Sequence, residues 1–199
     1  MPDAATLKFY ADNAADYVLH AQKPSRQLQA FLAHLPPGGT VLELGTGNGR
    51  DAAAMLAAGF EVTPSDASPE LAAEAQARLG LPVRIMAFHE LDDVALFDGV
   101  WACAALLHAP RDELTDDLEH IFRALRPGGH LMASFKAGDS EGRDALGRYY
   151  NYPDADELRE HVNDAAAWAT VEITQHEGSG YDNQPTRWLW LHAQKPAGP

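Results

Sequence analysis

The segment 43–49 has the composition of a turn that binds a ligand through its backbone. It reads Glu-Leu-Gly-Thr-Gly-Asn-Gly and follows the apolar run 40–44. Glycines at the end of a buried strand let a ligand approach the chain closely, and the helix that follows presents its first N–H groups. Gly45 and Gly47 are therefore expected to contact a ligand, with Thr46 between them.

Asp66 indicates what that ligand contains. It follows the second apolar strand, 19 residues after Gly47. A carboxylate at this place can accept hydrogen bonds from both hydroxyl groups of a ribose. The glycine spacing is G-x-G-x-G, and Arg50 stands where a dinucleotide-binding turn has its third glycine. This difference disfavours a nicotinamide cofactor.

Other side chains are candidates for contact with a second substrate. His108 follows the fourth apolar strand and is either a general base or a cap of the next helix. Tyr149 and Tyr150 belong to the segment 148–153, which predicts either an aromatic lid with hydroxyl donors or a packed surface loop. Lys136 either pairs with a substrate anion at the end of the fifth strand or lies on the surface.

Alternating apolar periods predict the elements that position these residues. Strands are expected at 40–44, 60–64, 82–88, 97–103, 130–135, 170–177 and 186–194. Helices are expected at 6–19, 25–35, 49–58, 68–79, 110–125 and 154–165. This order predicts an α/β protein with a Rossmann-like doubly wound sheet of seven strands, mostly parallel, that ends in an antiparallel C-terminal hairpin.

The chain length of 199 residues predicts one domain over 1–199. Within it we expect an N-terminal helical cover at 1–35, a cofactor-binding core at 40–136, and a substrate-side lid with the hairpin at 137–199. The formal net charge of −14 disfavours nucleic acid and anionic membrane as partners. No secretory or membrane-spanning segment is recognised, and a single cysteine forms no intrachain disulfide, so a cytoplasmic location is expected.

The nine histidines include no His-Glu-x-x-His motif, so no metal site is expected. The oligomeric state does not follow from the sequence.

The segment 41–49, Val-Leu-Glu-Leu-Gly-Thr-Gly-Asn-Gly, resembles the first strand and turn of class I S-adenosylmethionine-dependent methyltransferases. The resemblance continues in the family's order through 62–68, 97–110 and 125–135. It implies a pocket for S-adenosylmethionine. The segment 101–113 and the stretch Gly-Arg-Tyr-Tyr-Asn-Tyr-Pro are similar to a bacterial small-molecule subgroup near the tellurite-resistance and thiol-methylating enzymes.

The resemblance also implies roles for individual residues. Gly45 and Gly47 would wrap the methionine and ribose parts, Asp66 with the adjoining Ala67 would hold the ribose, and Glu43 would organise the turn or face the cofactor's amino group. The remaining implied contacts are Phe88, His89 and Glu90 at adenine, Cys103 and Ala104 beside methionine, and Tyr10 and Tyr17 in the helical cover. His89 departs from the family, which often has an acid at that position.

These observations predict a methyltransferase that acts on a small-molecule acceptor. A general base is required only if the acceptor must lose a proton. One alternative is a catalytically silent S-adenosylmethionine-binding regulatory protein. A less favoured alternative is a nicotinamide-dependent oxidoreductase.

Overall fold

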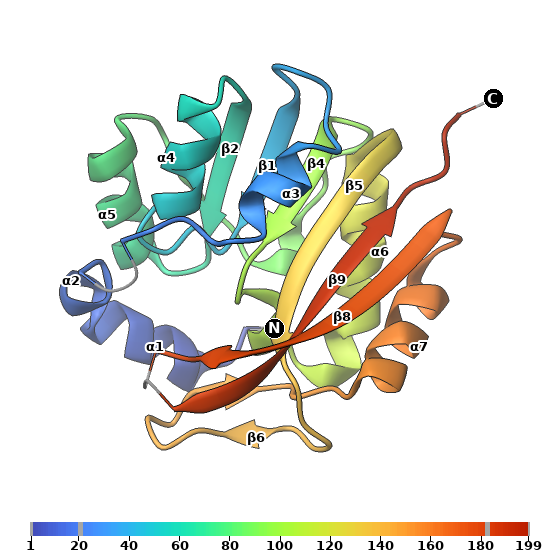
Figure 1. Ribbon diagram of the computed structural model, residues 1–199. Coiled ribbons are helices and arrows are strands. Elements are labelled where there is room, and N and C mark those ends of the chain that lie inside the picture. The colour runs from blue at the N-terminus through green and yellow to red at the C-terminus, as the bar shows by residue number, and fades with distance from the viewer. Residues whose placement is uncertain (1, 20–21, 182–183, 199) are drawn as a thin grey trace.

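A seven-stranded sheet forms the centre of the protein (Figure 1). The computed structural model describes residues 2–19, 22–181 and 184–198, so both ends of the predicted range 1–199 lie outside the described residues. The sheet order is β3-β2-β1-β4-β5-β9-β8. The strands are β1 (Thr40–Leu44), β2 (Glu61–Asp66), β3 (Arg84–Ile85), β4 (Phe97–Ala102), β5 (Leu125–Lys136), β8 (Thr170–Ser179) and β9 (Pro185–Gln194).

The first five strands pair in parallel, whereas β9 runs antiparallel to both β5 and β8. The predicted fold class, a doubly wound sheet that ends in an antiparallel hairpin, is confirmed.

Helices cover both faces of this sheet (Figure 1). Side chains of α3 (Leu28–Leu32) and α4 (Arg50–Ala57) pack on one face, and those of α6 (Leu114–Ala124) and α7 (Ala155–Ala165) pack on the other. The remaining elements are α1 (Ala4–Asp12), α2 (Ala14–Tyr17), α5 (Pro69–Leu79), the 3-10 turns η1 (Phe88–Glu90), η2 (Leu106–His108) and η3 (Arg111–Glu113), and the short pair β6 (Gly142–Arg143) and β7 (Tyr149–Tyr150). Among the described residues, no helix is long and apolar enough to cross a membrane.

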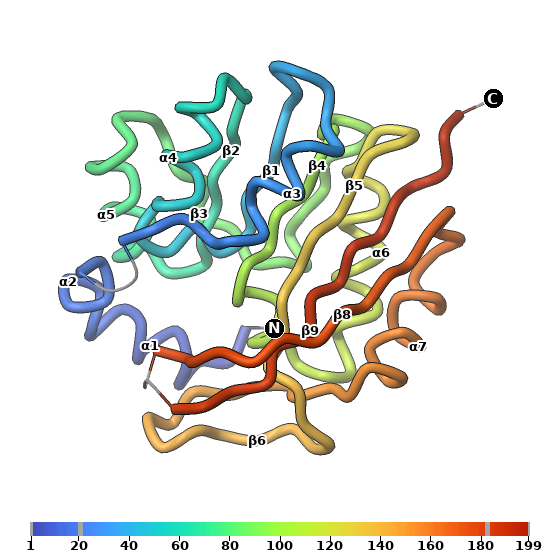
Figure 2. The backbone as a smooth tube through the Cα atoms, viewed as in Figure 1, coloured from blue at the N-terminus to red at the C-terminus, as the bar shows by residue number. Residues whose placement is uncertain are grey.

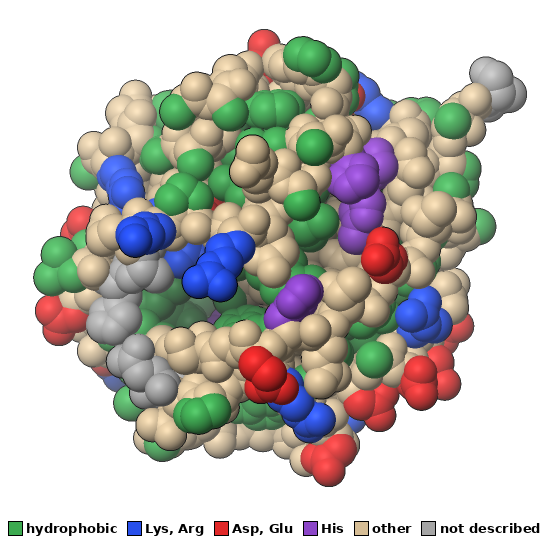
Figure 3. Space-filling view, in the orientation of Figure 1, with side chains coloured by type: hydrophobic (Ala, Val, Ile, Leu, Met, Phe, Trp, Pro, Cys, Tyr) green, Lys and Arg blue, Asp and Glu red, His purple; other side chains and the backbone are tan. Residues whose placement is uncertain are grey.

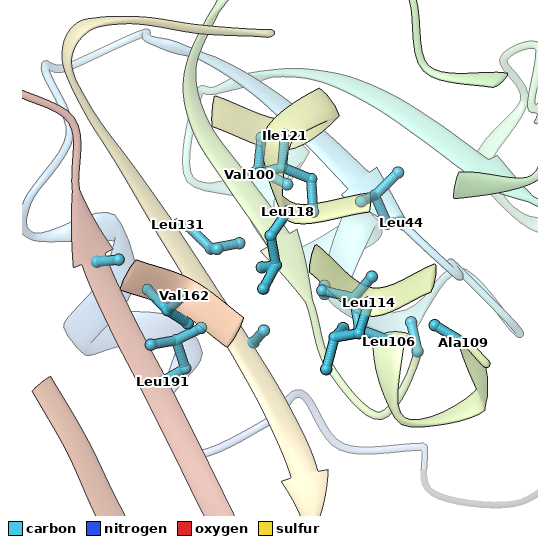
Figure 4. Close-up of a cluster of buried hydrophobic side chains, with 14 of the residues drawn as sticks. Leu44, Val100, Leu106, Ala109, Leu114, Leu118, Ile121, Leu131, Val162 and Leu191 are labelled. Carbon is cyan, nitrogen blue, oxygen red and sulfur yellow. The ribbon is translucent and has the colours of Figure 1, made fainter. Parts of the chain in front are cut away.

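The largest hydrophobic cluster lies between the sheet and α6 and α7 (Figure 4). Leu114, Leu118 and Ile121 recur at helical spacing and are fully buried against Val100 and Leu131. Full burial of such a side chain stabilises the fold by roughly 1.5–3 kcal/mol. The apolar face of α6 therefore holds β4 and β5, the two strands whose ends form one side of the site.

The N-terminal helices lie beside the β8–β9 hairpin, although the two are far apart in the sequence (Figure 2). The rings of Tyr17 and Tyr181 are stacked with their centres 5.4 Å apart, and Phe9 meets the same Tyr181 ring edge-on at 6.1 Å. The N-terminal helices and the β8–β9 hairpin thus form one wall together.

Several predicted boundaries differ in the structure. The helix expected at 6–19 breaks at Asn13, whose side-chain amide donates to the carbonyl of Phe9 at 2.8 Å and ends α1. The strand expected at 82–88 is reduced to Arg84–Ile85, because the backbone N–H of Ala87 donates to the Glu90 carboxylate and the chain turns into η1. The helix expected at 25–35 is limited to Leu28–Leu32.

The helix expected at 110–125 begins as the 3-10 turn η3 and becomes α-helical only at Leu114. Its end is set by Lys195, whose ammonium group donates to the carbonyls of Phe122 and Leu125. The strand expected at 130–135 begins already at Leu125, so Pro127, Gly128 and Gly129 lie inside β5, where the β4–β5 register shifts between Phe97 and Gly99. The pair β6 and β7 was not predicted.

Candidate functional site

The site lies where the order of the parallel strands reverses. β1 and β4 are neighbours, and the strands that follow each of them lie on opposite sides. Open α/β sheets bind ligands in the crevice at such a point, beyond the carboxyl ends of the strands. Two adjoining cavities occupy this place, and a hollow opens between α2 and the β8–β9 hairpin (Figure 3).

The smaller cavity has a volume of about 90 Å³. Asp66 and Ala67 at the end of β2 line one side, and Phe88 and His89 of η1 line another. α1 covers it with the side chains of Thr6 and Leu7, among others. The cavity therefore combines a carboxylate with an aromatic ring and apolar walls, as an adenosine group requires.

The larger cavity has a volume of about 730 Å³. Glu43, Thr46 and Cys103 line it near the glycine turn, and Lys136 and Trp188 line it farther along β5 and β9. The wall that both cavities share consists of Tyr10, Tyr17, Gly45, Gly47, Ala104 and His108. A ligand that spans both cavities must pass this wall.

The glycine turn has a backbone shape that larger residues rarely adopt. Gly45 has φ +70° and Gly47 has φ +55°, both in the left-handed region. A Cβ atom at Gly45 would lie 2.6 Å from the Cβ of Ala105, and one at Gly47 would lie 3.2 Å from the Tyr17 ring. The turn therefore requires glycine for its conformation and for close contact with the opposite wall.

Asp66 joins the glycine turn to the start of α5. One carboxylate oxygen accepts from the backbone N–H of Gly47 at 2.9 Å, and the other accepts from the N–H of Ser68 at 2.9 Å. Burial raises the pKa of Asp66, while these backbone donors oppose the increase. Each carboxylate oxygen accepts more than one hydrogen bond, so the group can also receive ribose hydroxyls.

Glu43 lies at the base of the turn and is only 3% exposed. Its carboxyl group accepts a hydrogen bond from the hydroxyl of Thr46. Burial raises the pKa of Glu43 to about 8, with the Thr46 bond opposing this increase. The side chain is therefore largely protonated at pH 7, and a cation placed beside it would favour its ionised form.

His108 connects the N-terminal cover to the segment after β5. Its Nδ1 lies 2.6 Å from the carbonyl oxygen of Tyr149, so Nδ1 carries the proton and Nε2 accepts from the Tyr10 hydroxyl at 2.9 Å. Arg148 also donates to the Tyr10 hydroxyl, at 3.3 Å. Burial lowers the pKa of His108 to about 4, so the ring is neutral at pH 7.

Arg148 is buried in an aromatic cluster. It is 1% exposed and forms an ion pair with Asp144 at 2.7 Å. Its guanidinium carbon lies 5.0 to 5.8 Å from the ring centres of Phe9, Tyr10, Tyr150 and Tyr181. These contacts stabilise a permanent charge on the wall of the larger cavity.

Lys136 provides a second cation on this wall. It is 6% exposed, so the interpretation of Lys136 as a surface lysine was wrong. Its Nζ atom lies 4.3 Å from the centre of the Tyr150 ring. The larger cavity therefore combines buried positive charge with aromatic surface.

Most of the predicted site residues lie at the two cavities. Those that line one or both are Tyr10, Tyr17, Glu43, Gly45, Thr46, Gly47, Asp66, Ala67, Phe88, His89, Cys103, Ala104, His108 and Tyr150. Burial raises the pKa of Cys103 to about 11, so its thiol is protonated at pH 7.

Tyr149 and Glu90 do not line either cavity. Successive side chains of a strand point to opposite faces, so Tyr150 points inward and Tyr149 outward. The Tyr149 hydroxyl donates to Glu141 at 2.6 Å and accepts from the N–H of Arg111 at 3.0 Å. Glu90 receives the N–H of Ala87 at 2.8 Å and fixes the start of η1. Tyr149 thus fits the alternative of a packed surface loop, and Glu90 shapes the turn without bordering either cavity.

Trp188 and Trp190 of β9 also line the larger cavity, although the sequence did not single them out as site residues. They alternate with Leu189 and Leu191, which are buried against the opposite face of the sheet. Two-residue alternation was the signal that they share one face, but not that this face lines a cavity.

Comparisons with known proteins identify the family. A methyltransferase domain family matches residues 41–129. Malonyl-[acyl-carrier protein] O-methyltransferase of Enterobacter lignolyticus is 33% identical over 131 residues, which are 64% of this chain and 51% of that protein. The structure of 1,6-didemethyltoxoflavin-N1-methyltransferase from Burkholderia thailandensis, with bound 1,6-didemethyltoxoflavin and S-adenosylhomocysteine, is 27% identical and has a TM-score of 0.75. That alignment covers 97% of this chain and 88% of the Burkholderia chain.

The chain belongs to the class I S-adenosylmethionine-dependent methyltransferase family. A Methanosarcina mazei methyltransferase structure, 16% identical with a TM-score of 0.76, covers 88% of this chain and all of its own length, and shows the same fold. The chain spans about half the length of the Enterobacter relative. The family's cofactor is S-adenosylmethionine, and the residues present fit it. Asp66 offers a carboxylate for hydroxyl groups and Glu43 a buried acid for an ammonium group, and Gly45 lines both cavities without a side chain that would block a ligand.

Proposed function

We propose that this methyltransferase transfers a methyl group from S-adenosylmethionine to a small anionic molecule bound in the larger cavity. The observation that carries the proposal is the shared wall. Gly45, Gly47 and Ala104 border both cavities, so a cofactor that extends from Asp66 to Glu43 presents its middle part to the larger cavity. A volume of about 730 Å³ suits a small molecule.

Residues from several elements would hold the cofactor. Asp66 would receive the ribose hydroxyls, Phe88 and His89 would border adenine, and Glu43 would face the amino group. Tyr10 and Tyr17 would cover it from the N-terminal side. Segments that are far apart in the sequence would thus close around the cofactor and exclude water from the reacting groups.

The charge of the larger cavity supports an anionic acceptor. The chain as a whole has a net charge of −14, yet Lys136 and Arg148 are both buried and both contact the Tyr150 ring. Arg148 forms an ion pair with Asp144 on the same wall. Lys136 lines the larger cavity and is the proposed partner of the acceptor's negative group, and Tyr150 and Trp188 border the acceptor's apolar part. Attraction between opposite charges is much stronger in such a buried place than in water.

Methyl transfer needs little proton chemistry from the protein. When bound, S-adenosylmethionine supplies a methyl carbon made electrophilic by the sulfonium. The protein aligns the acceptor and keeps water out. An anionic nucleophile needs no general base. His108 is a poor base because both of its ring nitrogens are engaged and its pKa is lowered to about 4. We therefore propose that His108 positions Tyr10 on the shared wall.

The names of the relatives do not define the acceptor of this chain. The Enterobacter protein is named as a malonyl-[acyl-carrier protein] O-methyltransferase, whereas the Burkholderia enzyme is named as a 1,6-didemethyltoxoflavin N1-methyltransferase. A place near the tellurite-resistance and thiol-methylating enzymes stays a prediction. A thiolate acceptor would satisfy the anionic requirement.

Cofactor binding is tested first, by calorimetric titration with S-adenosylmethionine and S-adenosylhomocysteine, with reduced nicotinamide dinucleotide as the control. Micromolar binding of the first two alone supports the proposal. Binding of the nicotinamide alone would restore the oxidoreductase alternative. Binding of S-adenosylmethionine without turnover of any acceptor would favour the regulatory alternative.

The acceptor class is tested by measuring the release of S-adenosylhomocysteine with matched pairs of compounds. One member of each pair is a carboxylate or a thiolate, and the other is the corresponding neutral amide or thioether. Turnover should be confined to the anionic members. Lys136→Met should raise KM for an anionic acceptor by about tenfold, the effect of losing one charge-assisted contact, while Lys136→Arg retains most affinity. Equal KM values for the two variants would contradict the role of Lys136.

A further inference from the structure

Three histidines from separate elements meet on one face of the sheet. His34 follows α3, His130 lies on β5 and His192 lies on β9. In the antiparallel register His130 pairs with Gln194 and Met132 with His192, which places the two histidines diagonally on the same face. Figure 3 shows histidine side chains gathered over α3, β5 and β9.

The spacing of their nitrogen atoms is close to that of a metal site. His130 Nδ1 lies 3.0 Å from His192 Nε2, and the ligand atoms of all three side chains lie within 4.8 Å of one another. Zinc binds imidazole nitrogen at 2.0–2.1 Å in tetrahedral geometry, which separates two ligand nitrogens by about 3.3 Å. Small rotations of the rings would therefore bring all three nitrogens to one ion.

A carboxylate lies beside the cluster. Glu172 is paired with His192 in the β8–β9 register, so the two side chains project from the same face of the sheet. The negative charge of Glu172 favours a cation at this place.

We propose that His34, His130 and His192 form a binding site for one divalent transition-metal ion, with Zn²⁺ as the expected occupant. Three imidazoles leave the fourth tetrahedral position for water or a carboxylate. When the ion binds, the hydrogen bond between His130 and His192 is lost. The proton of that bond moves to the other nitrogen of the imidazole that donated it. The sequence predicted no metal site because it has no helical histidine motif. These three histidines come together only through the fold, so no local motif indicates them.

The site is separate from the proposed methyl transfer and has a structural consequence. His34 lies just after α3, and Arg26 and Gln27, just before α3, line the larger cavity. An ion held by His34 and the two strands would fix this segment to the sheet. Since the ligands come together only in the folded chain, the ion should stabilise the folded state.

Calorimetric titration of the EDTA-treated full chain with ZnCl₂ at pH 7.5 tests the proposal. We expect one Zn²⁺ per chain, at least tenfold weaker binding by His34→Ala and by His192→Ala, and unchanged binding by the control variant His161→Ala. His161 bonds to Thr115 and lies outside the cluster. His34 is exposed, so its variant is expected to fold, and metal-free thermal unfolding checks this.

Thermal unfolding with and without ZnCl₂ gives a second readout. The ion should raise the Tm of the unaltered chain and of His161→Ala, and should have little effect on folded His34→Ala. Absence of saturable binding, or binding by His34→Ala equal to that of the unaltered chain, would overturn the proposal.

Discussion

The hydroxyl group of Tyr10 donates a hydrogen bond to Nε2 of His108 at 2.9 Å, although 98 residues separate them. The opposite ring nitrogen of His108 donates to the carbonyl of Tyr149, so one neutral imidazole joins α1 to the segment after β5. The N-terminal cover is therefore held on the cavity wall by polar contacts as well as by ring packing. Its position depends on His108 remaining neutral.

His108→Ala and Tyr10→Phe should both lower kcat, because each breaks the bond that holds the shared wall. We expect a decrease of about tenfold with a smaller change in the Kd of S-adenosylmethionine, since the contacts of Asp66 remain. Steady-state kinetics and calorimetry measure the two quantities. Tyr149→Phe is the control, because its hydroxyl bonds to Glu141 outside the cavities. Equal turnover by His108→Ala would remove His108 from the mechanism.

Asp66→Ala should weaken the binding of S-adenosylmethionine by about 1–3 kcal/mol, because charge-assisted hydrogen bonds to the ribose and to Gly47 are lost. Calorimetric titration measures the change. Glu61→Ala, at the exposed start of the same strand, should bind with unchanged affinity. If the two variants bind equally well, Asp66 does not hold the cofactor.

Gly45→Ala and Gly59→Ala form a matched pair for the glycine turn. Both glycines have positive φ, at +70° and +89°, but only Gly45 would bring its new Cβ to 2.6 Å from Ala105, whereas nothing lies within 4 Å at Gly59. Gly59→Ala should lower the free energy of unfolding by about 1–2 kcal/mol, the cost of the left-handed conformation. Gly45→Ala should lower it by a further 1–3 kcal/mol through overpacking. Urea unfolding compares them, and equal losses would contradict the steric argument.

The cofactor side of the site could be predicted from the sequence because its residues stand at strand ends within short motifs. Gly45, Gly47 and Asp66 are fixed by the order of strand, turn and helix, which also gave the sheet topology. Ser68 and Pro69 likewise marked the start of α5, where the Ser68 hydroxyl accepts from the N–H of Leu71 at 3.3 Å. Such signals are local, so they survive in a single sequence.

The proposed acceptor side could not be predicted in this way. Its position depends on which face of the sheet is left without a covering helix once the hairpin is in place. Lys136 is paired with Trp188 in the β5–β9 register, and its burial follows from that pairing and from Tyr150. The same long-range pairing brings His130 near His192. No local pattern reports these contacts, and alternation alone did not show that Tyr149 faces outward.

The raised pKa of Glu43 gives a dependence of stability on pH. Between about pH 4.5 and pH 8 the folded chain retains a proton on Glu43 that the unfolded chain has lost, so the free energy of unfolding falls as pH rises through this window. Glu43→Gln removes this contribution. The substitution should therefore increase the free energy of unfolding over that of the unaltered chain. This increase should be about 1–4 kcal/mol larger at pH 8 than at pH 4.5. Urea unfolding at both values tests this, with Glu61→Gln as the exposed control.

The same proton should appear in cofactor binding. If the ammonium group of S-adenosylmethionine lies beside Glu43, it favours the carboxylate, so binding at pH 7 should release close to one proton. Calorimetry in two buffers of different ionisation enthalpy counts it, and Glu43→Gln should abolish the release. Equal proton release by the variant would place the ammonium group away from Glu43 and leave that side chain only its hydrogen bond with Thr46.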